Sequence, residues 1–290
     1  MHDVFFFTDI HGMYDLYHAI IEYCKKQDPE ATIIFGGDAC DRGPDGYKII
    51  QSMLSDPYII YLKGNHEDLF VQAALRLKAY ITESNINEND LNAENVKNFI
   101  TFREGADKTA AIRNHVRNGG LPTLKDWILD GMKSEIIQKI NHLPYVCSYE
   151  NMDFCHAGGI YESFIRLSNN QYIYQDVYEY DKKSALWSRG AFQIGWCPNR
   201  LFIHGHTPVN FLSDYITESN ISFNDVRPVK YRGNFDITKT GYKMDFDTCV
   251  VYSNKIFLYN CTTNKITGFY KDKITNTISI EENILPYIEN

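Results

Sequence analysis

The sequence predicts an α/β fold in which two packed, largely mixed β-sheets are flanked by helices. In the first 80 residues, short apolar runs alternate with stretches of helical periodicity, as in a parallel sheet with crossover helices. Beyond Pro144 the pattern changes to short β runs, which indicate a second sheet packed on the first. With 290 residues the chain can bury a large core, and we expect one domain over residues 1–290.

The individual elements follow from these patterns. Apolar runs predict the first three strands at residues 4–7, 33–35 and 58–62. Apolar residues at helical spacing predict helices at residues 16–26, 49–54 and 69–77. In the second half, strands are expected at residues 145–148, 152–155, 201–203, 248–252 and 255–259, the last two joined across Ser253 and Asn254.

Residues from about 80 to 142 interrupt this alternation. The chain first turns polar and rich in Asn and Glu, and apolar positions then return through Trp127 and Ile140. We expect a helical cap insert here, of the kind that often selects a substrate.

Charge and cysteine content exclude several classes of protein. The formal net charge is −8, so nonspecific nucleic-acid binding is not expected. The apolar run Val4–Phe7 is too short for a signal peptide or a membrane span, and we expect no membrane partner. Seven cysteines form no CxxC pair, which favours reduced thiols and a cytoplasmic location. None is followed six positions later by Arg, which excludes a cysteine-based phosphatase loop.

Five short segments place polar residues where apolar strands give way to turns. They are Asp9-Ile-His-Gly12, Gly37-Asp-Ala-Cys-Asp-Arg-Gly43, Gly64-Asn-His-Glu67, His156-Ala-Gly-Gly159 and Gly205-His-Thr-Pro208. Asp38 follows Asp9 by 29 positions and Asn65 follows Asp38 by 27, and one strand, crossover helix and next strand occupy about 30 residues. The segments should therefore recur at one edge of one sheet.

The residue types in these segments suit a two-metal hydrolase site. If the first strand continued to its end, Asp9 and His11 would point the same way and face one cation. Asp38 has two oxygens with which to bridge two ions, and Asn65, His156 and His206 would supply neutral ligands to the second. Such oxygen and nitrogen donors suit Mn²⁺, Fe or Zn²⁺.

Two further residues suit the chemistry of phosphate esters. Paired ions bring the pKa of a bound water from about 15.7 toward about 7 and clamp the attacking and leaving oxygens. The planar fork of Arg42 can bind phosphoryl oxygens. His66 directly follows the proposed ligand Asn65, so it should stand beside the metals and act as general acid.

On these motifs the chain resembles the calcineurin-like metallophosphoesterases, and within them the phosphoprotein phosphatase branch. The resemblance runs from Asp9 to Pro208 and continues weakly from Met244 through Asp247 and Thr248. It implies a four-layer sandwich of two sheets and helices, and a site with two divalent ions, of which Mn²⁺ is the leading choice.

The resemblance also implies a role for each matching residue. The first metal takes Asp9 and His11, Asp38 bridges, and the second metal takes Asn65, His156 and His206. His66 is the acid and Asp41 its orienting carboxylate, and the arginines that bind phosphate fall on Arg42 and, less securely, Arg189.

The departures from the family pattern are few. Thr8 replaces the first Gly of the opening segment, which we expect to alter the strand end without touching a ligand. Cys249 and Val250 follow Asp247-Thr248 where bacterial relatives commonly have Gly. The short motifs resemble those of bacterial and phage members, which include serine/threonine and tyrosine phosphatases and symmetrical diadenosine tetraphosphate hydrolases.

The sequence thus predicts a metal-dependent phosphoesterase that hydrolyses phosphomonoesters by direct attack of metal-bound hydroxide, with phosphoprotein side chains as the leading substrates. A dinucleoside polyphosphate hydrolase is the alternative enzyme, so the substrate is a phosphoprotein, a nucleotide or a dinucleotide. A noncatalytic metal-binding interaction module is a third possibility, and the intact His66, Asp41 and Arg42 argue against it.

The other histidines are expected to have structural roles. His204 can share a face with His206, and we expect it to support the site or to lie in the core. His115 and His142 are expected to be surface or internally satisfied histidines.

Overall fold

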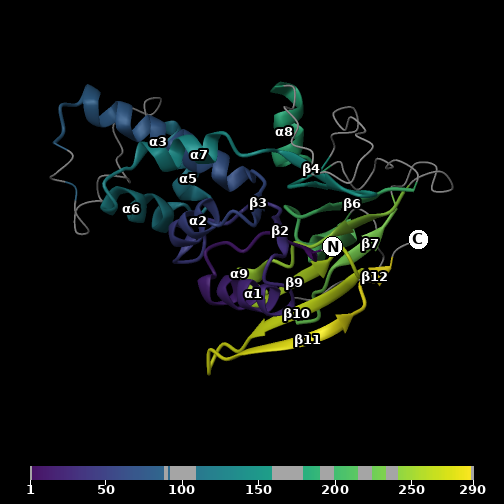
Figure 1. Cartoon of the computed structure of the whole chain (residues 1–290). Coiled ribbons are helices and arrows are strands. Elements are labelled where there is room, and N and C mark those ends of the chain that lie inside the picture. Colours follow the sequence, from purple (N-terminus) through teal and green to yellow (C-terminus); the bar gives the residue numbers. More distant parts are fainter. Residues whose placement is uncertain are drawn as a thin grey trace.

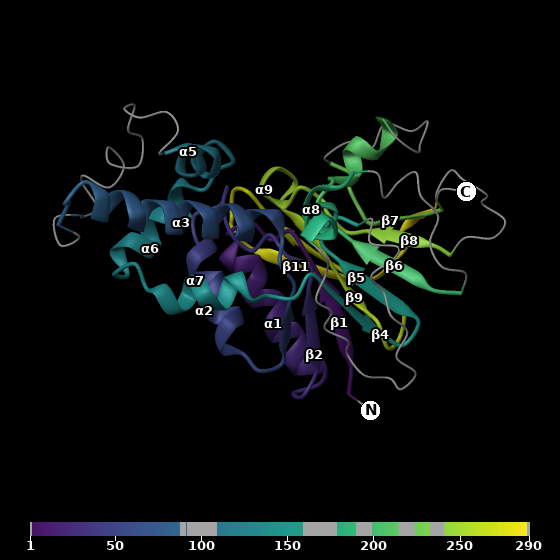
Figure 2. The ribbon, with the colours of Figure 1, turned by 90° about the horizontal axis from the view of Figure 1, so that it is seen from above.

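The computed structural model describes residues 2–87, 91, 109–158, 179–189, 199–214, 224–232 and 241–288. Within these residues the strands form two six-stranded sheets. Figures 1 and 2 show the two sheets packed on each other, with most of the helices gathered beside the first sheet. This is the predicted α/β architecture of two mixed sheets flanked by helices.

The first sheet has the strand order β11-β10-β9-β1-β2-β3. Its parallel half contains β1 (Val4–Phe7), β2 (Thr32–Phe35) and β3 (Ile59–Tyr61). Its antiparallel half contains β9 (Lys255–Asn260), β10 (Lys265–Lys271) and β11 (Ile278–Ile284), and β9 pairs with β1. Residues 255–284, far along the chain, therefore complete the sheet that its beginning starts.

The second sheet has the order β12-β7-β8-β6-β5-β4. Its strands are β4 (Val146–Tyr149), β5 (Met152–Cys155), β6 (Leu201–His204), β7 (Val229–Tyr231), β8 (Lys243–Asp245) and β12 (Tyr287–Ile288). Strands β5, β6 and β8 run parallel to one another, so the ends of β5 and β6 lie side by side.

Strand β1 shows why so apolar a run is needed at the centre of the molecule. Val4 and Phe6 belong to the core between the two sheets, where Phe6 contacts Phe154 of β5 at 5.2 Å between ring centroids. Phe5 and Phe7 point the other way, into the core beneath the helices. Alternate side chains thus fill two different cores, which a strand covered on both faces requires.

The helices are α1 (Tyr14–Gln27), α2 (Gly46–Ser55), α3 (Asn65–Glu83), α5 (Ala110–Arg117), α6 (Leu121–Leu129), α7 (Ser134–Asn141), α8 (Glu179–Trp187), α9 (Val250–Ser253) and the 3₁₀ helix Val209–Asp214. Helices α5, α6 and α7 all pack on α3, and Figures 1 and 2 show them together on one side of the sheets. Their apolar residues, such as the fully buried Trp127, share one core with β1 and β2. Residues 88–90 and 92–108 of the expected insert lie outside the described residues.

The predicted strand over residues 248–252 is wrong. The chain turns at Cys249, which adopts a left-handed backbone with φ of 53°, and then forms the short helix α9. The hydroxyl of Thr248 donates a hydrogen bond of 2.6 Å to the carbonyl of Lys255, so the segment closes on itself before β9 begins. Val250 and Val251 pack into the core from this helical turn.

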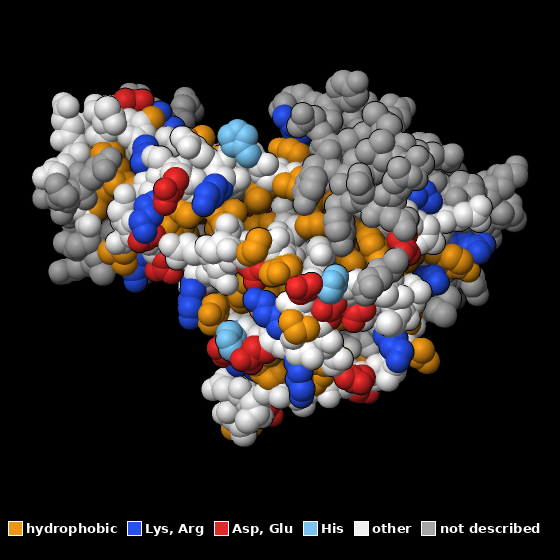
Figure 3. Space-filling model, in the orientation of Figure 1, with side chains coloured by type: hydrophobic (Ala, Val, Ile, Leu, Met, Phe, Trp, Pro, Cys, Tyr) orange, Lys and Arg blue, Asp and Glu red, His pale blue; other side chains and the backbone are white. Residues whose placement is uncertain are grey.

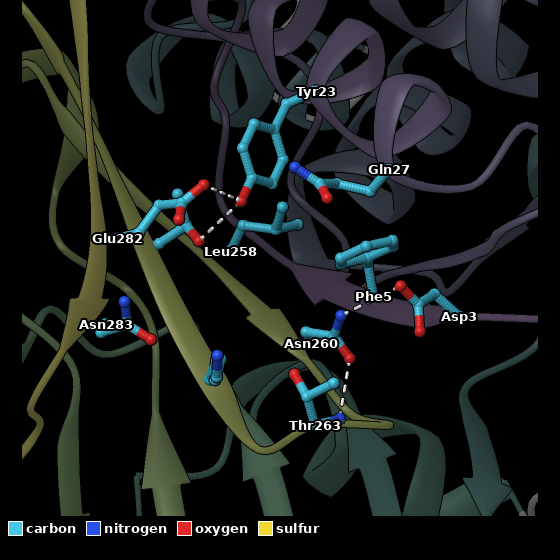
Figure 4. Close-up of a pocket in the computed structure, with 11 residues that line it drawn as sticks. Asp3, Phe5, Tyr23, Gln27, Leu258, Asn260, Thr263, Glu282 and Asn283 are labelled. Atoms are coloured by element: carbon cyan, nitrogen blue, oxygen red, sulfur yellow. Dashed lines mark hydrogen bonds between the residues drawn. The ribbon is translucent and has the colours of Figure 1, made fainter.

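A small polar pocket of about 190 Å³ lies where α1 meets the antiparallel half of the first sheet (Figure 4). The Tyr23 hydroxyl donates to Glu282 at 2.8 Å across it, and Asn260 donates to Asp3 at 3.3 Å. Because Asp3 precedes β1, this pocket lies at the amino end of that strand. The motif residues all follow the carboxyl ends of their strands, so the pocket is not part of their site.

On the face shown in Figure 3, acidic and basic side chains are interspersed. Among the described residues, no helix is long and apolar enough to cross a membrane.

Candidate metal centre and active site

The loops that follow β1 and β2 are bonded to each other. The amides of Asp9 and His11 donate to the carbonyls of Gly37 and Asp38, each at 3.0 Å. Strand β1 ends at Phe7, so Asp9 and His11 do not share a face by strand alternation. A turn places them instead, with φ of 54° at Asp9 and 41° at His11.

Left-handed backbone is concentrated in these loops. Six of the predicted site residues have positive φ although none is glycine: Asp9, His11, Asp38, Asp41, Arg42 and His206. Such a conformation costs about 1–3 kcal/mol for each residue and persists only where surrounding contacts impose it. Strain of this kind is typical of functional sites.

Asp38 occupies the centre of the cluster. Its Oδ2 lies 3.6 Å from Nε2 of His11 and 3.8 Å from Nε2 of His66, and its Oδ1 lies 3.4 Å from Nε2 of His156. Burial opposes ionisation, but His156, His66, His11 and Arg42 hold the pKa of Asp38 well below its ordinary value. An ionised carboxylate with both oxygens facing nitrogen donors is suited to bridging two cations.

The second sheet contributes two histidines to the same cluster. His156 follows β5 and His206 follows β6, and a ring nitrogen of each lies 2.9 Å from Oδ1 of Asn65. Nδ1 of His156 donates to the carbonyl of Gly36 at 2.9 Å, which leaves a lone pair on the nitrogen that faces Asn65. Two lone-pair-bearing atoms that converge in this way suit a shared cation.

Asp9 lies close to Asp38 and His156. It accepts hydrogen bonds from the Thr8 hydroxyl at 2.6 Å and from the His206 amide at 3.2 Å. Thr8 therefore touches a predicted ligand, and the expectation that it would not is wrong, because the turn brings its hydroxyl onto the adjacent carboxylate. At Gly205 a Cβ would lie 1.9 Å from Oδ2 of Asp9, so only glycine allows this approach.

His66 and Asp41 form a buried pair. Nδ1 of His66 donates to Oδ2 of Asp41 at 2.8 Å. Burial lowers the pKa of His66, but Asp38 and Asp41 outweigh it and raise that pKa above the ordinary value.

Arg42 lies next to the His66–Asp41 pair and contacts both His66 and His11. Its guanidinium donates to Nε2 of His11 at 2.7 Å and to Nε2 of His66 at 3.0 Å. His11 can bind a metal through Nε2 only when Arg42 releases it. Nδ1 of His11 donates to the Cys40 carbonyl at 2.9 Å, which orients the ring for that role.

Arg189 lies at the edge of the site. Arg189 is exposed just beyond α8, and its charge lowers the pKa of His206, for which burial is the main cause. Trp187 of the same segment contacts the His206 ring edge-on, with 6.0 Å between centroids. Gly159 of the fourth segment lies outside the described residues.

His204 does not join the cluster. Its two ring nitrogens bond the Gly205 carbonyl at 3.0 Å and the Tyr231 hydroxyl at 2.6 Å, and the ring stacks on Phe202. Both nitrogens are thus used within the second sheet.

The donor set fits metal ions. Ligand atoms of His11, Asp38 and His66 lie within 4.8 Å of one another, as do those of Asp9, Asp38 and His156. Nε2 of His206 is buried and has no hydrogen-bond partner among the described residues. Burial raises the pKa of Asp9 well above its ordinary value, and the nearby carboxylates of Asp247 and Asp38 raise it further. A cation would relieve both the orphaned nitrogen and the crowded carboxylates.

Comparison with known proteins identifies the family. The model of the calcineurin-like phosphoesterases matches residues 2–241, which is most of the chain. The chain belongs to the calcineurin-like phosphoesterase family. It is therefore a hydrolase of phosphate esters that carries candidate ligands for metal ions.

No curated sequence matches this phosphoesterase significantly. Among solved structures, it is similar to a protein proposed to be a diadenosine tetraphosphatase, with 12% identity, coverage of 98% of this chain and 94% of the other, and a TM-score of 0.45. A metallophosphoesterase from Sphaerobacter thermophilus gives 12% identity, coverage of 92% and 86%, and a TM-score of 0.43. A serine/threonine phosphatase from Saccharomyces cerevisiae gives 13% identity, coverage of 99% of this chain and 82% of the other, and a TM-score of 0.44. Because these TM-scores are below 0.5, we draw no conclusion about the substrate from them.

Two residues of this calcineurin-like phosphoesterase support the site although sequence reasoning gave them little weight. Glu67 accepts the amides of Asp38 and Ala39, each at 2.8 Å, and so holds the turn after β2. Asp247 lies close enough to Asp9 to raise its pKa, and the Cys249 amide donates to Asp247 at 2.8 Å. Asp247 follows a strand end, as Asp9 and Asp38 do, and that pattern was the signal available for finding it.

Proposed function

We propose that this protein is a dinuclear-metal phosphoesterase that hydrolyses phosphomonoesters, with phosphorylated protein side chains as the leading substrate class. One observation carries the proposal. The His66–Asp41 pair, bonded at 2.8 Å, directs Nε2 of His66 to within 3.8 Å of Asp38, the carboxylate shared by both candidate metal groups. A proton donor beside a metal centre is what cleavage of an alkyl phosphate needs.

The metal ligands in this proposal are Asp9 and His11 for one ion, Asp38 between the two, and Asn65, His156 and His206 for the other. Mn²⁺ is the ion that we propose, and Fe and Zn²⁺ suit the same donors. When bound, such a pair activates water for attack on phosphorus and stabilises the charge that develops on the phosphoryl oxygens.

The protein's own residues orient the substrate and supply a proton. Arg42 and Arg189 hold the phosphoryl oxygens, and Arg42 turns from His11 and His66 to do so. His66 gives its Nε2 proton to the leaving oxygen as the P–O bond breaks, so the N–H bond breaks and an O–H bond forms. Asp41 keeps the other proton on Nδ1 and fixes the ring.

The remaining expectations belong to the same proposal. We propose one domain over residues 1–290, with a helical cap insert over residues from about 80 to 142. We also propose a cytoplasmic location, which six described cysteines support because all are free and buried. The proposed function involves neither a membrane partner nor nonspecific nucleic-acid binding.

One observation favours the second candidate, a dinucleoside polyphosphate hydrolase. A recess of about 530 Å³ is lined by Trp187, Tyr145, Lys182 and Lys183, among others, and Trp187 also contacts His206. Aromatic and basic side chains beside the site would suit a nucleobase and a second phosphate.

A comparison of kcat/KM on the two classes of substrate separates the two candidate functions. Purified protein with added Mn²⁺ is assayed on phosphoserine and phosphotyrosine peptides and on diadenosine tetraphosphate, with Asp38→Asn as the inactive control. Higher kcat/KM on the peptides supports the proposal. A clear preference for the dinucleotide overturns the leading substrate class, and bound metal without turnover on any ester overturns the enzymatic function.

A further inference from the structure

The turn that holds Asp41 and Arg42 is anchored from an unexpected direction. Both residues have a left-handed backbone, with φ of 71° and 63°. The Asp41 amide donates to the hydroxyl of Thr123 at 3.0 Å, and the Arg42 amide donates to the carbonyl of Gly119 at 2.9 Å. Both partners lie in the α5–α6 segment, so these helices impose a conformation that the turn would not adopt alone.

His115 of α5 adds a side-chain contact to this anchor. Its Nε2 donates to Oδ1 of Asp41 at 2.9 Å, while Nδ1 of His66 donates to Oδ2 of the same carboxylate at 2.8 Å. Each oxygen of Asp41 thus binds one imidazole. His115 is fully buried, so of the two expected readings, a surface or an internally satisfied histidine, the first does not apply.

The surroundings of His115 hold its ring in place but offer no hydrogen-bond partner to Nδ1 among the described residues. The ring packs on Phe70, with 5.6 Å between centroids. A Cβ at Gly120 would lie 2.2 Å from Nε2 of His115, so the backbone presses directly on the ring. Nδ1 is buried without a hydrogen-bond partner among the described residues, which costs free energy. An apolar side chain would pack there without that cost, so packing alone does not explain a histidine.

Two donors determine both the charge and the plane of the Asp41 carboxylate. Burial alone would raise the pKa of Asp41, but His115 and His66 hold it well below the ordinary value. An ionised carboxylate can only accept, so it keeps the proton of His66 on Nδ1. Without the His115 bond, Oδ1 would be a buried charged oxygen that has lost its partner, and the carboxylate could rotate away from His66.

We propose that His115 is a positioning residue for phosphoester hydrolysis, which holds the Asp41 carboxylate and thereby orients His66 toward the leaving oxygen. This inference rests on the proposed function. The proposed role connects helix α5 to the proton-transfer step. The described side-chain hydrogen bond of His115 goes to Asp41, and not to a candidate metal ligand or to Arg42.

The test compares two variants at position 115 whose new side chains, Gln and Met, have nearly equal length. His115→Gln places an amide N–H near the position of Nε2, whereas His115→Met fills the space without a donor. We expect His115→Met to lose about 10²-fold in kcat on an alkyl phosphate but less than about fivefold on 4-nitrophenyl phosphate, whose acidic leaving group needs no proton. His115→Gln should recover most of the loss. Equal losses on both esters, or a Gln variant as defective as the Met variant, would overturn the proposal.

Controls separate positioning from a general loss of structure. His142 is exposed at the end of α7, and its ring has one described hydrogen bond, to the Gln138 carbonyl, so His142→Gln and His142→Met should leave both rates unchanged. Mn²⁺ affinity measured by calorimetry should be unaltered in His115→Met. In the double variant with His66→Asn, the alkyl rate should fall no further than in His66→Asn alone, and additive losses would contradict a shared step.

A spectroscopic readout covers the case in which His115→Met does not fold. In ¹⁵N-histidine-labelled wild-type protein, His66 should carry a proton on Nδ1 and His115 should carry one on Nε2, and an Nε2 of His115 without a proton would overturn the proposal. If wild-type protein with Mn²⁺ hydrolyses no ester, the proposed function fails. If it hydrolyses both esters and His115→Met matches the wild type, only the role of His115 fails.

Discussion

The loops at the ends of β1, β2, β3, β5 and β6 and the helices α5 and α6 contribute to the same site in different ways. The strand-end loops supply the candidate ligands and carry recognisable motifs, because each ligand sits next to its own strand. The helices supply supports without any motif: His115 and Thr123 reach Asp41 across 74 and 82 residues of sequence. Chemistry that depends on local spacing is visible in a sequence, whereas support that depends on packing is not.

Asp38→Asn tests the strand-end region most severely. Removing the charge shared by both metal groups should abolish the binding of at least one ion and lower kcat about 10³-fold, since a metal supplies several kcal/mol of transition-state stabilisation. Metal content by mass spectrometry and turnover of 4-nitrophenyl phosphate measure this. The exposed Asp15→Asn is the control. An Asp38→Asn protein that retains two ions would contradict the bridging role.

His66→Asn tests the point at which the two regions meet. The variant should lose about 10²-fold or more on alkyl phosphates and much less on aryl phosphates, because only the alkoxide leaving group requires a proton. Steady-state kinetics on matched ester pairs measure the difference, with the exposed His18→Asn as control. Equal losses on both esters would show that His66 is not the acid.

Thr123→Val tests the helical region alone. The change removes the acceptor of the buried Asp41 amide and should lower the free energy of unfolding by about 1–3 kcal/mol. Urea denaturation measures it against Thr82→Val, an exposed threonine that bonds its own helix and should cost less than about 0.5 kcal/mol. A Thr123→Val protein as stable as the wild type would remove the evidence that α6 anchors the turn.

Thr8→Val tests a support within the strand-end region. Loss of the hydroxyl that donates to Asp9 should weaken Mn²⁺ binding about tenfold, the lower end of the effect expected from an outer partner of a ligand. Thr8→Ser keeps the hydroxyl and should bind as the wild type does. Calorimetric titration at one pH compares the three proteins, and equal affinities would mean that the bond does not orient Asp9.

The smallest expected effect is the pH dependence of metal binding. Burial raises the pKa of Asp247 to about 6, with Asp38 contributing, so near pH 5.5 the folded protein holds a proton that the unfolded chain has released. The contribution of the protonated Asp247 carboxyl group to folding stability is lost as pH rises through 6. A bound cation would compensate for the negative charge of the ionised Asp247 carboxylate. Mn²⁺ should therefore bind at least about fourfold more tightly at pH 7.5 than at pH 5.5. A Mn²⁺ affinity that falls between pH 5.5 and pH 7.5 would contradict a raised pKa of Asp247 beside the metal site.

Several elements could be predicted from the sequence because their signals are local. The run Val4–Phe7 gave its strand with the correct bounds, and the spacing of the segments correctly placed Asp9, Asp38 and Asn65 at neighbouring strand ends. The strand predicted over residues 248–252 failed because an apolar stretch does not distinguish a strand from a buried turn of helix. That β9 would join β1 was equally invisible, since the pairing depends on residues more than 250 positions apart.

The sequence by itself determined the alternation of strands and helices, the family and the candidate ligands, because these depend on residue type and short spacing. Only the tertiary structure decided how the ligands meet: through left-handed turns instead of an extended strand, with His156 and His206 delivered by a second sheet. It also revealed that His115 and Thr123 hold Asp41. Such contacts come from the packing of distant elements, and no local pattern of residues specifies them.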